Sequence, residues 1–279
     1  MNTTNEPASA EGGNKLRPGT KDFTEGPVHQ HLVRLTLFMV LGLVSVLGAS
    51  LVETIYISRV GTIDLAALGF TFPLAMIFQS VAMGLGIGAS SVVARAMGSG
   101  QSEKAKKIIT HSLVLMMILI VLLIALIYWN TDTIFSFLGA NEEASTLAVA
   151  YMDIWLLGLP FFTFAMVGSH LMRAIGDPAT PAYLMMIGSV LQVLIAPILI
   201  FGLLGAPKLG LEGAAWGFLL ARLGSLLMYG YIIAIRDKLM IFSMQGFIAS
   251  CRDILHVGLP AIASNSIAPL SMALITKLI

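Results

Sequence analysis

The chain has 279 residues, of which 57% are hydrophobic and only 11% are charged. A soluble core of this size cannot bury so much apolar surface, so the composition predicts a protein whose solvent is the lipid bilayer. The net charge of +1 gives no overall attraction to nucleic acid, and we expect no nucleic-acid partner. The single cysteine, Cys251, excludes an intrachain disulfide and offers no cluster with metal-ligand spacing.

The first segment, residues 1–30, is polar and rich in Gly, Pro, Thr, Asn and Glu. Such a composition cannot repay the entropy of ordering, so we expect a disordered cytoplasmic tail. The apolar run starts only at Leu32. A cleavable signal peptide would have its apolar stretch nearer Met1, behind a short basic region, so none is expected.

Runs of about 20 apolar residues are needed to cross about 30 Å of hydrocarbon, and the chain offers them one after another. The expected spans are Leu32–Ile57, Leu65–Val92, Ile108–Tyr128, Leu147–Met172, Pro181–Leu204 and Gly213–Ile235, with a seventh from near Leu255 to Ile279. The predicted fold class is therefore an all-α membrane protein. A six-helix transmembrane bundle occupies residues 31–235, an amphipathic cytoplasmic linker 236–254, and the first helix of a second lobe 255–279.

The basic residues predict which ends of the spans face the cytoplasm. With the N-terminus inside, the outer loops hold only Arg59 and Lys208. The cytoplasmic segments then hold Lys15, Arg17, Lys21, Arg34, Arg95, Lys104, Lys106, Lys107, Arg173, Arg236, Lys238 and Arg252. This asymmetry matches the positive-inside bias, so we expect a multi-pass protein of the cell inner (plasma) membrane with a cytoplasmic N-terminus.

Small residues and prolines in the spans predict how the helices pack. Gly84 and Gly88 form a small-xxx-small pair suited to close packing of two helices. This run follows a hydrophobic helix rather than a strand, which argues against a nucleotide-binding loop. Prolines within spans each remove a backbone hydrogen bond and permit a kink; they are Pro73, Pro160, Pro197 and Pro269.

An ionisable group inside a span is costly and is therefore a functional candidate. Glu53, toward the outer end of the first span, is the candidate for ion coupling: its carboxyl group could take up a proton or bind sodium through its oxygens. The alternative is an interfacial glutamate that reaches water. Asp153 lies near the outer start of the fourth span with Tyr151 and Trp155 beside it, which favours an interfacial position over a cavity.

Arg222, near the middle of the sixth span, cannot easily reach water and requires a partner or a wet cavity. A structural pair and a substrate contact both remain open for it. Uncharged polar groups inside the spans are Gln79, Ser189 and Gln192. The last two are three residues apart, share a helix face, and either line a cavity or bridge helices. The loops hold no soluble catalytic module, so we expect a protein that is not an enzyme.

Four segments resemble the multidrug and toxic compound extrusion (MATE) transporters, in the order in which that family carries them. Val52 to Gly61, followed by Asp64 to Gly69, is similar to the family's "VDT…G…LAA" stretch. The others are Ala94–Gly100 with Glu103–Ala105, Met172–Pro181 with its Arg-x-x-Gly-Asp-x-x-Thr-Pro element, and Ile200–Gly202 leading to Gly210–Ala215. Together these segments cover nearly all of the chain after the tail.

The resemblance implies a twelve-helix antiporter of two six-helix lobes that exports organic, often cationic or amphipathic compounds in exchange for H+ or Na+. This chain would supply the N-lobe and the opening of the C-lobe, and its end inside the seventh span looks like truncation. The expected partners are the bilayer and small organic substrates, with a monomer when full length. No cofactor is expected beyond the coupling ion. The alternative from the same superfamily is a flippase for lipids or lipid-linked oligosaccharides.

The chain also departs from the family pattern. Glu53 stands where aspartate is common, which keeps the carboxylate but lengthens its reach. Ser189, Gln192 and Ala196 stand where many members carry Asn and Asp, so a sodium site that needs a second carboxylate is not expected here. Phe38 replaces a proline that bends the first helix in some members.

Overall fold

The computed structural model describes residues 28–278, and this part of the chain contains helices and no strands. Seven of its helices are long and apolar enough to cross a membrane, which confirms the predicted number of spans in the described residues. The long helices are α1 (Val28–Ser58), α2 (Thr62–Gly98), α3 (Ser102–Tyr128), α5 (Glu142–Ala174), α6 (Ala179–Phe201), α7 (Gly210–Gly230) and α8 (Phe247–Leu278).

The element boundaries differ from the sequence expectation in several places. The short helix α4 (Thr131–Phe137) was not predicted, and the last turns of the fifth and sixth spans form η1 (Leu203–Gly205) and the π-helix η2 (Tyr231–Arg236). α8 begins at Phe247 rather than near Leu255, so part of the predicted linker 236–254 is helical. The predicted tail, 1–30, lies almost wholly outside the described residues, and α1 begins at Val28.

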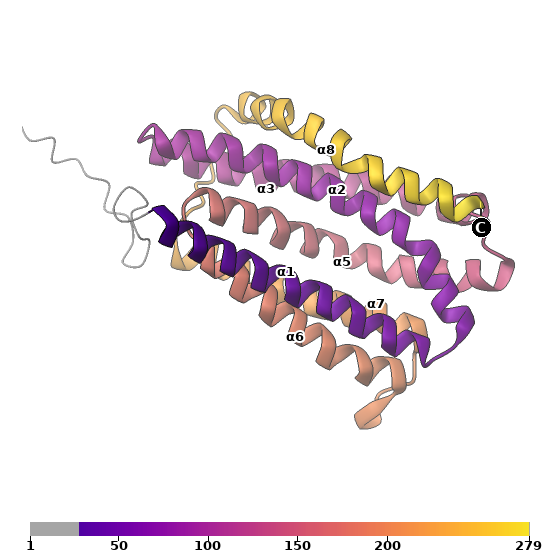
Figure 1. The fold of residues 1–279 in the computed structure, drawn as a ribbon. Coiled ribbons are helices and arrows are strands. Elements are labelled where there is room, and N and C mark those ends of the chain that lie inside the picture. Colours follow the sequence, from indigo (N-terminus) through magenta and orange to yellow (C-terminus); the bar gives the residue numbers. More distant parts are fainter. Residues whose placement is uncertain (1–27, 279) are drawn as a thin grey trace, which may run out of the picture.

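The helices pack in an order that differs from their order in the chain. α1 packs on α6, α6 on α7, α7 on α5, and α5 on α2, with α3 against α2 and α5. α8 then packs along α2 on the far side of the bundle from α1 (Figure 1). α5 and α7 therefore lie in the middle, and side chains of α1, α6 and α7 can meet inside the bundle.

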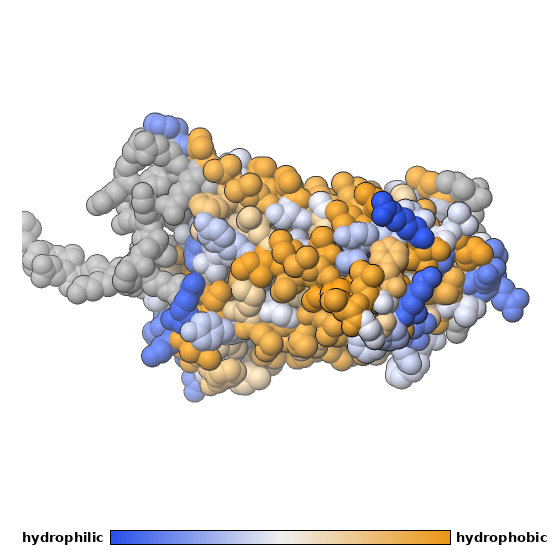
Figure 2. All heavy atoms as spheres, turned by 90° about the horizontal axis from the view of Figure 1, so that it is seen from below, coloured by the Kyte–Doolittle hydropathy of each residue, from blue (hydrophilic) through white to orange (hydrophobic). Residues whose placement is uncertain are grey.

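The outer surface has the polarity that a bilayer requires. Figure 2 shows the face on the side of α6, where apolar residues cover the middle and hydrophilic residues gather toward both ends. Exposed apolar side chains on this side of the bundle include Leu47 and Leu51 of α1 and Val190 and Leu194 of α6. Since lipid tails solvate such groups, this surface agrees with a multi-pass membrane protein.

The two ends of the bundle carry the loops that the topology predicts. The turn between α1 and α2 lies beside the start of α7, because Gly210 is close to Val60 and Asp64. At the opposite end, Arg236 lies 3.8 Å from the carboxylate of Asp177, which follows α5. The few basic residues of the predicted outer loops and the many of the predicted cytoplasmic segments therefore lie at opposite ends of the helices, as the loop charges predict.

The glycine pair on α2 makes the close helix contact that the sequence predicts. A Cβ atom at Gly84 would lie 2.7 Å from the backbone nitrogen of Ile262, and one at Gly88 would collide with the carbonyl oxygen of Ile254. Gly258 of α8 lies on the other side of this crossing. Because there is no room for a side chain, the backbones of α2 and α8 are in direct contact.

We expect Gly88→Ala to destabilise the purified chain by about 1–3 kcal/mol, because the new methyl group overpacks the crossing of α2 and α8. The matched control is Gly48→Ala in α1, where a Cβ atom meets nothing within 4 Å. That variant should be neutral or stabilising by less than about 1 kcal/mol, since alanine favours helix. Thermal unfolding in detergent measures both, and equal effects would mean that the crossing is not tightly packed.

Candidate functional site

Three of the predicted site residues meet inside the bundle although they lie on three different helices. The side-chain amide of Gln192 (α6) donates from Nε2 to Oε2 of Glu53 (α1) at 2.7 Å. Its Oε1 accepts from Nη2 of Arg222 (α7) at 2.8 Å. Gln192 therefore joins an acid and a base that do not touch each other, and we call these three residues the polar relay.

The position of Glu53 follows from the way α1 lies along α6. Gly42, midway along α1, lets this helix approach Ala182 near the start of α6, where a Cβ atom would be 3.5 Å from the Ala182 Cα. Phe38, where some MATE members have proline, packs edge to face on Tyr183 with ring centroids 5.8 Å apart. Tyr56 packs on Phe201 in the same way near the other end. With both ends fixed, Glu53 lies opposite Gln192.

Small residues bring Arg222 to the same point from α7. A Cβ atom at Gly217 would lie 3.0 Å from the Cα of Ala196, and one at Gly188 would lie 2.8 Å from Oγ of Ser225. These close approaches on α6 and α7 shorten the distance that the Arg222 side chain must cross. Ala196 is therefore buried at the crossing of the two helices.

Aromatic rings surround the Arg222 guanidinium. Its Cζ lies 5.3 Å from the ring centroid of Phe162 (α5) and 5.0 Å from that of Phe218 (α7). Phe218 is also stacked on Trp155, with centroids 5.2 Å apart. The negative faces of the rings stabilise a cation that has little access to water. Phe218 is one helical turn before Arg222, and this spacing was a signal for the contact that the sequence reasoning missed.

The relay leaves hydrogen-bonding capacity unused. Within the part of the chain that the structure describes, the buried atoms Glu53 Oε1, Ser189 Oγ and Arg222 Nε have no hydrogen-bond partner. Such groups are expensive to bury and are found at sites that change their partners during function. Tyr151 of α5 also lies within electrostatic reach of Glu53. The site is thus a buried acid with one satisfied and one free carboxylate oxygen.

The structure decides some of the alternatives that the sequence left open. The carboxylate of Glu53 points into the bundle instead of reaching water at its surface, and Gln192 bridges helices. Arg222 has a side-chain partner in the amide of Gln192, and a substrate contact at Arg222 stays a prediction. Ser189 is buried one turn before Gln192. Asp153 is half-buried on α5 with interactions of its own, and Gln79 is exposed on α2, so the structure does not place Gln79 in this buried cluster.

Comparisons with known proteins agree with this architecture. The family model MatE matches residues 39–198. The chain is 35% identical to the FAD transporter of Shewanella oneidensis, with 91% of this chain and 57% of the relative covered. It is 28% identical to the multidrug export protein MepA of Staphylococcus aureus, with 74% of this chain and 45% of the relative covered. The chain spans about half the length of these relatives.

Solved structures give the same result. A MOP superfamily transporter from Pyrococcus furiosus, described as having a binding pocket of reverse polarity, matches with a TM-score of 0.82 and 32% identity. The match covers 90% of this chain and 56% of that one. An outward-facing MATE transporter matches with a TM-score of 0.79 and 33% identity over 86% of this chain and 53% of the other. Both identities are high enough for the matches to concern more than the fold.

We expect Gln192→Leu to destabilise the chain by about 2–4 kcal/mol, because it leaves a carboxylate oxygen and a guanidinium nitrogen buried without partners. The matched control is Ser189→Ala on the same face of α6, whose hydroxyl has no partner to lose among the described residues. Its effect should stay within about 0.5 kcal/mol. Chemical unfolding in detergent measures both, and similar losses would show that the relay contributes nothing to stability.

Proposed function

Because the chain belongs to the MatE family of multidrug and toxic compound extrusion transporters, we propose that it forms one lobe of a secondary active antiporter. This lobe and the first helix of the second lobe would be part of a protein that exports organic compounds in exchange for H+ or Na+ by alternating access. The observation that carries the proposal is the buried carboxylate of Glu53 with one unused oxygen. The transport path lies between two lobes, so activity requires the second lobe.

The charge of the relay gives a physical basis for the exchange. With Glu53 ionised and Arg222 protonated, the relay is neutral and its hydrogen bonds through Gln192 are complete. When Glu53 takes up a cation, the relay carries a net positive charge and repels a cationic compound. Proton binding and binding of a cationic compound thus oppose each other, which is the thermodynamic requirement for antiport.

We favour the proton over sodium as the coupling ion. Oε2 of Glu53 receives an N–H group of Gln192, and the amide oxygen of that residue is engaged by Arg222. Sodium is a hard cation that requires several oxygen ligands, as calcium and magnesium do, whereas a proton needs only the free oxygen of Glu53. The resemblance supports the same choice, because none of the matching positions, Ser189, Gln192 and Ala196, carries a second carboxylate.

A second candidate is the transport of anionic compounds such as flavin nucleotides. It is supported by the relative named FAD transporter and by the buried cation Arg222, which lies beside the rings of Phe162 and Phe218. For an anion the charge argument reverses: protonation of Glu53 leaves Arg222 without its counter-charge and favours anion binding, so the proton and the anion would move together instead of exchanging. A flippase for lipids or lipid-linked oligosaccharides would use Arg222 in the same way, but would need further cations in its cavity.

The orientation in the membrane is part of the proposal. Most basic residues of the spans and their turns lie at the end of the bundle that holds the α2–α3 and α5–α6 turns. This supports placing that end and the N-terminus in the cytoplasm. The protein is proposed to lie in the cell inner membrane and to carry out no catalysis. Glu53, which is near the opposite end of α1, would then take up its ion from the outside.

We expect Glu53→Gln, placed in the full-length protein, to abolish ion-coupled efflux while leaving its amount in the membrane unchanged. The amide keeps the shape of the side chain but cannot bind a proton or carry the charge. Dye efflux from everted or right-side-out vesicles with an imposed ion gradient measures the effect. Glu143→Gln, an exposed carboxyl group in the first turn of α5, is the matched control. Unimpaired efflux by the Glu53→Gln variant would contradict a role of Glu53 in ion coupling.

The direction of proton movement should separate the two candidate substrate classes. Addition of a transported cationic dye to protein in lightly buffered detergent should release protons, because the cation and the proton compete at the relay. Addition of flavin mononucleotide should instead take protons up if the anion binds at Arg222. Arg222→Gln should remove the uptake, with riboflavin, which lacks the phosphate, as the ligand control. Proton release with both compounds would contradict the anion candidate.

A further inference from the structure

The connection between α7 and α8 is held by two adjacent side chains of α3. Thr110 Oγ1 accepts a hydrogen bond from the backbone nitrogen of Ile241 at 3.1 Å. The ring of His111 reaches two atoms, Oγ of Ser250 at 2.9 Å through Nδ1 and the carbonyl oxygen of Ser243 at 2.7 Å through Nε2. Thr110 and His111 are 3% and 1% exposed, so these bonds are made out of contact with water.

The backbone of the connection is held by isolated turn hydrogen bonds, such as that from the Ser243 nitrogen to the Ile241 carbonyl oxygen. Residues 237–246 lie between η2 and α8 and form no regular helix or strand. The backbone groups of Ile241 and Ser243 that bond to α3 would otherwise lie unpaired at the edge of an apolar bundle. Leaving such groups unsatisfied is costly, so the two α3 side chains determine where this segment can lie.

The hydrogen bonds also fix the state of the His111 ring. A carbonyl oxygen only accepts, so Nε2 must carry a proton and donate to Ser243. In the neutral ring, Nδ1 then accepts from the hydroxyl of Ser250. One side chain thus presents a donor to the connection and an acceptor to the first turn of α8, and joins both to α3.

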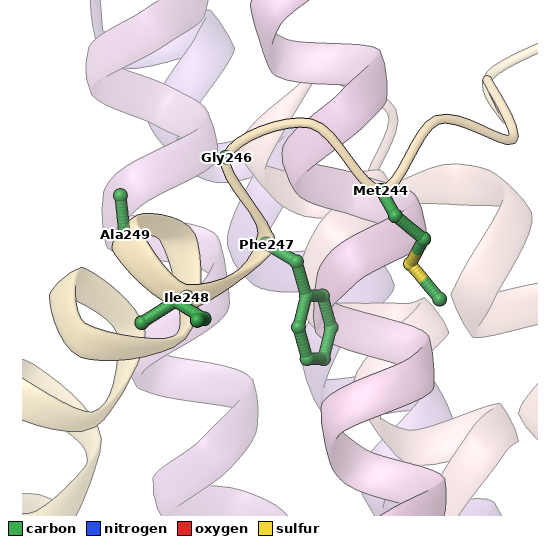
Figure 3. Close-up of a pocket in the computed structure, with 5 residues that line it drawn as sticks. All are labelled: Met244, Gly246, Phe247, Ile248 and Ala249. Carbon is green, nitrogen blue, oxygen red and sulfur yellow. The ribbon is translucent and has the colours of Figure 1, made fainter.

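The turn beside these bonds is built to present an aromatic ring to His111. Gly246 has a left-handed φ of 78°, which reverses the chain just before α8. Phe247 follows and packs edge to face on His111, with centroids 5.4 Å apart and an interplanar angle of 90°. Figure 3 shows Phe247 and Met244 extending from this turn, while Ile248 and Ala249 begin α8 at the edge of a hollow.

α8 is held by two contacts. Along α2 the contact is a close crossing of glycine and apolar residues, with a hydrogen bond across it, from Oγ of Ser80 to the carbonyl oxygen of Asn265 at 3.0 Å. At its start, His111 binds Ser250 in the first turn of α8, and α3 makes two further hydrogen bonds to Ser243 and Ile241 in the connection just before it. These bonds to α3 fix the start of α8.

We propose that Thr110 and His111 form a latch that fixes the start of α8 against α3, and that α8 moves along α2 only when this latch opens. His111 is a positioning residue in this mechanism. The inference goes beyond the proposed function, because it uses none of the relay residues and holds whichever compound or ion is transported. In a two-lobe transporter, α8 is the first helix of the second lobe, so the latch would control movement between the lobes.

Cys251 is a native reporter of the latch, since the chain contains no other cysteine. It follows Ser250 on the first turn of α8 and packs against the core of the bundle. Opening of the latch would lift this turn and expose the sulfur atom. Because Cys251 is only partly buried, opening of the latch is measured by the increase in its alkylation rate by N-ethylmaleimide over that of the wild type under native conditions.

We expect His111→Ala to raise the alkylation rate of Cys251 about tenfold in membranes, because two buried hydrogen bonds are lost. Thr110→Val, which frees only the Ile241 nitrogen, should give a smaller increase in the same direction. His111→Gln offers an amide donor and acceptor in place of the ring nitrogens and should restore a rate near that of the wild type. A purely space-filling role of the imidazole ring would not give this rescue.

The matched control is Ser112→Ala, next to His111 on α3. Ser112 is equally buried, but its hydroxyl bonds to Ile108 O within its own helix and does not touch the connection. The alkylation rate of Cys251 in the Ser112→Ala variant should equal that of the wild type. Equal rates for His111→Ala, Thr110→Val and Ser112→Ala would overturn the latch. If His111→Ala does not accumulate in the membrane, Thr110→Val and Ser250→Ala provide the same comparison.

Discussion

The cost of removing two opposite charges from water is the constraint on which the inner half of this bundle depends. Glu53 and Arg222 lie on helices that are far apart in the chain, and both charged groups are buried. Neither could remain charged without a partner, and no direct ion pair joins them among the described residues. The Gln192 amide, a donor at one end and an acceptor at the other, satisfies both at once. α1, α6 and α7 must therefore keep the one arrangement in which this side chain reaches both.

Small residues make that arrangement possible. The hydrophobic effect does not drive helices together inside lipid, so close packing and interhelical hydrogen bonds must do so. Gly188, Gly213 and Gly217 bring α6 and α7 into backbone contact beside the relay, and Gly84 and Gly88 do the same for α2 and α8. The first group places polar side chains opposite one another. The second leaves a mostly apolar contact, crossed by the hydrogen bond from Ser80 to the carbonyl oxygen of Asn265.

The spans, their number and the glycine crossing could be predicted from the sequence because they depend on local hydropathy and spacing. Glu53, Gln192 and Arg222 were each identifiable as polar groups in apolar spans. Their contact was not, because residues 53, 192 and 222 are joined only by the packing order of α1, α6 and α7. The start of α8 was misplaced for a related reason. Arg252 and Ser250 suggested a polar linker, whereas His111 and the turn at Gly246 allow a helix there.

The relay and the latch sit at different depths of the bundle and on different helices, and this separation has a mechanical consequence. A charge change at Glu53 acts on α1, α6 and α7, whereas α8 is held by α2 and α3. The elements that connect the two are α5 and α2: α5 packs on both α7 and α2, and carries Phe162 and Trp155 beside Arg222. A shift of Arg222 would press on these rings first. Coupling between ion binding and movement of the second lobe would thus pass through the packed aromatic side chains of α5, not through a continuous chain of hydrogen bonds.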